Sequence, residues 1–184
     1  MTEAGANPRV LYVIVCAAPP ARDVNKLVEM CQQQGWDVCT ILTPKALAFT
    51  SANDLATLTG HPVRSEYKHP DEPDVLPPPD AMVVAPATFN TINKWALGIA
   101  DTLALGLLTE GIGKGLPIVA LPSLNTAQAS HPAWTWSVER LRACGVRVLY
   151  GPGGFEPVDP GSGNEFLPVY PWERASAALA EVTS

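Results

Sequence analysis

The chain alternates between short apolar runs rich in valine and isoleucine and longer stretches in which apolar residues recur every three or four positions. The first pattern is typical of strands buried on both faces of a sheet, and the second of helices that bury one side. Strands are predicted at residues 10–16, 38–42, 81–85, 117–121 and 146–150. Because helical stretches separate them, we expect an α/β fold, a single-domain, doubly wound (Rossmann-like) parallel sheet of about five to six strands.

Three segments complete this outline. Residues 1–8 are small and polar, which predicts a flexible tail in front of one domain at residues 9–184. Residues 66–79 combine proline with acidic side chains, so we expect an extended surface loop rather than a helix or a central strand. A last helix is predicted to start near residue 171 and to run through Val182.

Composition narrows the functional classes. The 184 residues are 47% hydrophobic and 16% charged, as in one globular domain. The net charge is −6 and no basic stripe is present, which argues against a nucleic-acid partner. The four cysteines form no C-x-x-C pair and the three histidines are scattered, so we expect reduced thiols and no metal site. The apolar run at residues 10–18 is too short to span a bilayer, and we expect a cytoplasmic protein without a membrane partner.

Residues 82–101 form the stretch around which the chain is organised. An apolar strand leads to Pro86, which lacks an N–H group and is expected to end the strand. A polar cluster follows, and then apolar residues recur at helical spacing through Ile99. The free N–H groups in the first turn of such a helix favour an anion. The simpler interpretation is that Asn90 or Thr91 only caps the helix.

The same stretch resembles a known family. Pro86-Ala87-Thr88-Phe89-Asn90-Thr91 is similar to the Pro-Ala-Ser-Ala-Asn-Thr motif of the flavin-dependent cysteine decarboxylases, which include phosphopantothenoylcysteine decarboxylase and the lantibiotic peptidyl-cysteine decarboxylases. Residues 92–101 follow the continuation of that motif. Leu121-Pro122-Ser123-Leu124-Asn125 resembles the Pro-Ala-Met-Asn substrate motif, and Pro132 follows at the matching spacing. The resemblance covers roughly residues 9 to 150.

The resemblance implies FMN in a crevice at the carboxyl ends of the strands, where doubly wound sheets bind ligands. It implies that Asn125 contacts the substrate, although this residue also suits an Asx turn that satisfies its own backbone. Lys45 is either a phosphate ligand or a solvated surface charge. The residues expected near the cofactor are Thr43, Lys45, Pro86, Ala87, Thr88, Phe89, Asn90 and Thr91.

Three departures from the family pattern concern catalysis and phosphate binding. The Gly/Ser-rich loop after the first strand is replaced by Ala17-Ala18-Pro19-Pro20-Ala21, whose prolines lack N–H donors. The His-x-Glu-Leu context of the catalytic histidine is absent; His69 is either a displaced equivalent or an exposed loop residue. No cysteine follows Cys144, so the reactive cysteine of the family's flap is missing.

The resemblance therefore implies an FMN-binding flavoprotein that acts by flavin-dependent redox chemistry or oxidative decarboxylation on a small-molecule or peptide substrate carrying a thiol or carboxylate. The alternative is a non-catalytic flavin-binding or regulatory subunit, and the sequence leaves open whether the chain is an enzyme. A flavin prenyltransferase-like relative would need basic residues near the C-terminus, where only Arg174 follows Arg147. The family also implies a homo-oligomer, a trimer or a dodecamer.

Overall fold

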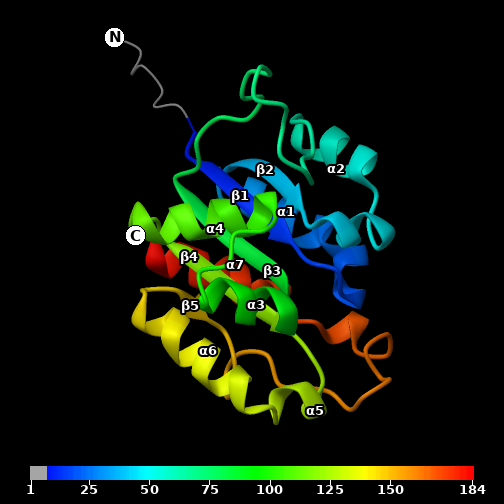
Figure 1. Ribbon diagram of the computed structural model, residues 1–184. Coiled ribbons are helices and arrows are strands. Elements are labelled where there is room, and N and C mark those ends of the chain that lie inside the picture. Colours follow the sequence, from blue (N-terminus) through cyan, green and yellow to red (C-terminus); the bar gives the residue numbers. More distant parts are fainter. Residues whose placement is uncertain (1–7) are drawn as a thin grey trace.

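A five-stranded parallel sheet forms the centre of the protein (Figure 1). The computed structural model describes residues 8–184, so the predicted tail, apart from Pro8, lies outside the described residues. The strand order is β2-β1-β3-β4-β5, with parallel pairing throughout. The strands are β1 (Val10–Val15), β2 (Asp37–Leu42), β3 (Ala81–Thr88), β4 (Ile118–Ser123) and β5 (Arg147–Val148). The predicted doubly wound α/β fold is confirmed.

Helices cover both faces of this sheet. On one face α1 packs against α7, and on the other α3 packs against α4 and α6 (Figure 1). The α-helices are α1 (Asn25–Gln33), α2 (Ala52–Thr59), α3 (Phe89–Ala96), α4 (Leu103–Gly113), α5 (Thr126–Ala129), α6 (Pro132–Ala143) and α7 (Trp172–Val182). Short 3-10 helices are η1 (Pro19–Asp23), η2 (Pro44–Ala48) and η3 (Leu167–Val169). None of the helices in residues 8–184 has the length and apolar character that crossing a bilayer requires.

The central strand β3 differs from the prediction. Pro86 was expected to end this strand, but β3 continues to Thr88 and pairs with β4 on both sides of the proline. The register shifts between Val84 and Ala87, so the missing N–H group of Pro86 falls at the irregularity. The Pro86 carbonyl accepts a hydrogen bond from the Cys16 N–H at 3.1 Å, which ties the end of β1 to β3. The expectation is therefore wrong, because the shift accommodates the proline.

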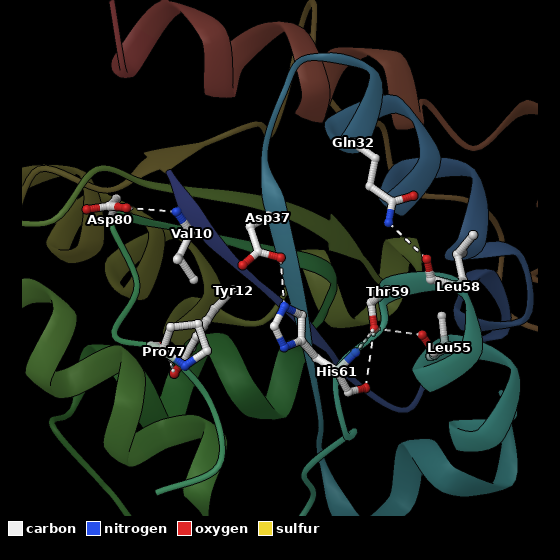
Figure 2. A network of polar contacts seen from close by, with 10 residues as sticks. All are labelled: Val10, Tyr12, Gln32, Asp37, Leu55, Leu58, Thr59, His61, Pro77 and Asp80. Atoms are coloured by element: carbon white, nitrogen blue, oxygen red, sulfur yellow. Dashed lines mark hydrogen bonds and ion pairs between the residues drawn. The ribbon is translucent and has the colours of Figure 1, made fainter. Parts of the chain in front are cut away.

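Residues 66–79 contain only turns and bends, as predicted. Figure 2 shows how the longer segment 61–80 is attached to β1 and β2. His61 Nε2 lies 2.6 Å from Asp37 Oδ1, and the Tyr12 hydroxyl donates to the Pro77 carbonyl at 2.7 Å. The Val10 N–H donates to Asp80 Oδ2, and the Asp80 N–H donates back to the Val10 carbonyl. Arg64 of the same segment pairs with Ile41 near the carboxyl end of β2, so the segment lies along β2 before it returns to the amino end of β1 at Asp80.

Candidate functional site

A crevice of about 810 Å³ lies at the carboxyl edge of the sheet. Its walls come from the loops that follow β1, β2, β3 and β4, together with residues 158–164. Parallel sheets bind ligands at this edge, and the volume is in the usual range for small-molecule sites. Seven residues expected at the site line it: Thr43, Lys45, Thr88, Phe89, Asn90, Thr91 and Asn125.

The start of α3 forms the middle of the crevice. Thr88 is the N-cap, and its Oγ1 accepts a hydrogen bond from the Thr91 N–H at 3.3 Å. The prediction that Asn90 or Thr91 caps this helix is therefore wrong: both lie inside the helix, and Thr88 has the extended backbone that a cap needs. The remaining N–H groups of the first turn favour an anionic or acceptor group. Pro86 and Ala87 are buried in β3 and support the cap from below.

A buried thiol lies beneath the start of α3. Cys16 is 1% exposed and lies beside Thr88 and Thr91. Burial raises the pKa of Cys16, and the neighbouring threonines offset only part of the rise. The thiol therefore stays neutral. Cys31 and Cys39 are also buried and unpaired, whereas Cys144 is exposed.

The loop after β1 offers few hydrogen-bond donors to the crevice. Pro19 and Pro20 have no N–H group, and the N–H groups of Ala18 and Ala21 donate within the loop, to the carbonyls of Cys16 and Ala18. Donors are instead available after β2. Thr43 begins η2 without a side-chain cap bond, and Lys45 is exposed with no ion-pair partner among the described residues.

Asn125 lies at the other end of the crevice, after β4. Its Oδ1 accepts a hydrogen bond from the Gln128 N–H at 2.9 Å, and Gln128 Oε1 accepts one from the Asn125 N–H at 3.3 Å. This capping box occupies the oxygen of the Asn125 amide and leaves its Nδ2 as a donor. The local-turn interpretation of Asn125 thus holds for the oxygen, and the nitrogen remains able to contact a ligand.

Phe89 is a rigid aromatic part of the wall. Its ring stacks on Trp134 with a centroid distance of 6.0 Å and meets the His131 ring edge-on at 5.8 Å. Trp134 is fully buried and contacts Tyr150 in turn, at 5.2 Å. Because two rings hold Phe89 from behind, its position in the crevice is fixed.

The segment after β5 covers the crevice. The Val158 carbonyl accepts a hydrogen bond from the Thr126 N–H at 2.9 Å, and Arg174 donates to the Gly153 carbonyl. Asp159 of this segment and Gln128 line the crevice, and neither was expected from the sequence. The Asn-x-x-Gln spacing of a capping box would have indicated Gln128, whereas nothing local to Asp159 marks it.

His69 does not reach this crevice within its own chain. It is exposed and absent from the crevice lining, and its Nδ1 is 3.4 Å from a carboxylate oxygen of Asp71. Its catalytic role remains a prediction. Among residues 8–184 no group of three or more histidine, cysteine, aspartate or glutamate side chains is arranged to hold a metal ion.

The chain matches the family model described as Flavoprotein over residues 4–169. It is 31% identical to a prokaryotic cysteine/cysteine sulfinic acid decarboxylase over 115 residues, 59% of this chain and 29% of that protein. It is 33% identical to the coenzyme A biosynthesis bifunctional protein CoaBC of Bacillus subtilis (66% of this chain, 29% of that protein). It is 32% identical to the mouse phosphopantothenoylcysteine decarboxylase (66% and 61%). The matched segments thus span less than two thirds of the length of these relatives.

Two solved structures of similar fold are SpaF and EpiD. The FMN-dependent cysteine decarboxylase SpaF superposes with a TM-score of 0.68 at 25% identity, covering 97% of this chain and 99% of SpaF. The epidermin biosynthesis protein EpiD from Staphylococcus aureus gives a TM-score of 0.67 at 21% identity, covering 76% of this chain and 81% of EpiD. The likeness to EpiD concerns the fold alone.

Proposed function

Because this chain belongs to the Flavoprotein family, we propose that it binds FMN in the carboxyl-edge crevice and acts there on a small-molecule or peptide substrate that carries a thiol and a carboxylate. The observation that carries the proposal is the convergence of seven expected site residues on one crevice of suitable volume. The relatives named as cysteine and phosphopantothenoylcysteine decarboxylases support oxidative decarboxylation as the reaction.

The residues that would bind the FMN phosphate differ from the family pattern, whereas those that would face the ring system follow it. Lys45 and the Thr43 hydroxyl would take the phosphate, because the Pro19-Pro20 loop has few donors to offer. Thr88, Asn90 and the first-turn N–H groups of α3 would face the ring system and its polar substituents. Bound FMN would supply the electron acceptor, which no side chain provides.

The protein's own share of the reaction is binding and orientation. The Asn125 Nδ2 group would donate to the substrate carboxylate, since its amide oxygen is already occupied. Phe89 would exclude water from that end of the crevice, held in place by Trp134 and His131. Fixed groups of this kind lower the barrier by holding the substrate in a reactive orientation.

We further propose a homo-oligomer, a trimer or a dodecamer. His69 does not line the crevice of its own chain, so a catalytic role for it would require that this segment of a neighbouring copy approach the crevice. The three buried, unpaired thiols favour a reducing compartment, which supports a cytoplasmic location.

A second candidate is a flavin-binding or regulatory subunit without turnover. It is favoured by the absence of a cysteine after Cys144 and by the position of His69. Replacing Asn125 by Asp separates the two candidates. If turnover is lost while FMN stays bound, the chain is an enzyme. If thiol-carboxylate compounds are not turned over by the unaltered protein either, the regulatory role is supported.

The cofactor assignment is tested by the visible absorption spectrum of the purified protein and the mass of the released cofactor. We expect the bands of oxidised flavin and release of FMN. A colourless protein that also fails to take up added FMN would overturn the assignment.

Lys45→Gln tests the phosphate contact. A hydrogen bond to a charged group contributes about 1.5–3 kcal/mol, so we expect FMN affinity to fall about tenfold or more. Riboflavin, which has no phosphate, should bind both proteins equally. Lys114→Gln is the matched control, because Lys114 pairs with Glu110 outside the crevice. If Lys45→Gln weakens FMN and riboflavin binding equally, Lys45 does not contact the phosphate.

A further inference from the structure

The crevice has a positive and a negative end. Three charged side chains line it, Lys45, Lys94 and Asp159. Lys94 forms an ion pair with Asp101, whereas Lys45 and Asp159 have no ion-pair partner among residues 8–184. Lys45 follows β2 and Asp159 lies beside the end of β4, with β1 and β3 between them. Three strand spacings correspond to about 14 Å, so the two charges act on different parts of a ligand.

The backbone of Asp159 is held at this end of the crevice. The preceding residue, Val158, pairs with Asn125 and accepts the Thr126 N–H. The Asp159 carbonyl accepts hydrogen bonds from the N–H and the hydroxyl of Ser162, at 3.1 and 2.7 Å. These contacts use only the backbone of Asp159. Its carboxylate therefore remains able to accept hydrogen bonds from a ligand.

Asp159 and Asn125 offer complementary groups. The Asn125 oxygen is bonded to the Gln128 N–H, so this residue presents the two hydrogens of Nδ2. An ionised carboxylate such as that of Asp159 only accepts hydrogen bonds. A donor for an anion and an acceptor for a cation thus lie on paired segments at one end of the crevice.

We propose that the substrate is an α-amino acid with a free ammonium group, which Asp159 accepts while the Asn125 Nδ2 binds the α-carboxylate. The inference rests on the proposed function, which assigns the Lys45 end to the cofactor phosphate and leaves this end to the substrate. An N-acylated cysteine, as in a peptide, has a neutral amide at the same place and leaves the Asp159 charge unpaired, so its affinity is lower.

The test compares binding of S-methyl-L-cysteine and N-acetyl-S-methyl-L-cysteine by titration calorimetry. The two probes share the carboxylate and differ in the ammonium group, and the methylated sulfur has no thiol proton to lose. The proteins are the wild type, Asp159→Asn and the matched control Glu165→Gln, which removes a charge from the same segment outside the crevice. Flavin uptake is recorded separately from the absorption spectrum.

We expect the wild type to prefer the free amino acid and Asp159→Asn to weaken that probe about two- to fivefold, the range for solvent-exposed ion pairs such as one with the exposed Asp159. The N-acetyl probe should bind both proteins alike, and Glu165→Gln should behave as wild type. Equal or tighter binding of the N-acetyl probe, an unchanged Asp159→Asn variant, or no binding of either probe overturns the inference. Calorimetry needs no flavin signal, so absence of flavin uptake counts against the proposed function alone.

Discussion

Replacing Thr88 by Val removes the hydroxyl that caps α3 while the side chain keeps its shape. The hydroxyl accepts the Thr91 N–H at 3.3 Å and lies 3.1 Å from the Thr91 hydroxyl, and Thr91 is 4% exposed. Loss of an N-cap costs about 0.5–2 kcal/mol, and a buried donor left without a partner costs about 1–3 kcal/mol. These costs describe the same bond and are not summed. We expect the free energy of unfolding to fall by about 1–2 kcal/mol.

For a chain of this length, each kcal/mol lowers the melting temperature by about 2–4 °C, so Thr88→Val should melt about 2–8 °C below the wild type. The assay is urea unfolding and calorimetric melting of flavin-free protein, which separates the cap from any ligand effect. Thr88→Ser is the control, because serine caps as well as threonine does. An unchanged Thr88→Val, or a Thr88→Ser variant that is equally destabilised, would refute the reasoning, since the methyl group rather than the hydroxyl would then matter.

Three further perturbations have definite outcomes. Tyr170→Phe removes the hydroxyl that donates to the Leu121 and Pro122 carbonyls at 3.0 and 2.9 Å, and should lower the free energy of unfolding by about 1–2 kcal/mol; unchanged urea unfolding would contradict this. Gly106→Ala places a Cβ 2.0 Å from the Tyr67 hydroxyl, so limited proteolysis should cut residues 61–80 faster, and unaltered cleavage would show that Tyr67 does not hold the segment. Burial raises the pKa of Cys31 from 9.0 to about 12. Between these pH values the unfolded chain binds fewer protons than the folded chain, so the free energy of unfolding should fall as pH rises from about 9 to about 12. Cys31→Ala should show a less steep fall. If urea unfolding gives the same dependence on pH for both proteins, this thiol does not contribute.

The strands were predictable because each is an apolar run that local sequence alone identifies. The exception within β3 is Pro86, whose missing N–H falls at a register shift that depends on the neighbouring strand. Strand β5 is shorter than the predicted run at residues 146–150, since only Arg147 and Val148 pair with β4. A local apolar run thus predicts that a strand is present more reliably than it predicts where the strand begins and ends.

The crevice was predictable where a motif or a strand end marked it. The sequence pointed to Asn90 or Thr91 as the cap of α3, and only the extended backbone at Thr88 shows that the helix begins one residue after Thr88. Asp159 had no periodic or motif signal, because its place depends on pairing between Val158 and Asn125, 33 positions apart in the sequence. The sequence of either segment alone does not predict long-range pairing of this kind.

The segment over the crevice has consequences for how the protein can be altered. It begins at the bridge between Tyr150 and Phe155 and ends where buried Tyr170 bonds to the end of β4, so both of its ends are fixed to the sheet. Lengthening a loop between fixed ends costs little, about 0.6 kcal/mol for each doubling. Residues 159–165, between the Val158–Asn125 bridge and Phe166 packed on Phe155, can therefore be exchanged for segments of other length and charge, which would change ligand choice while the sheet is kept.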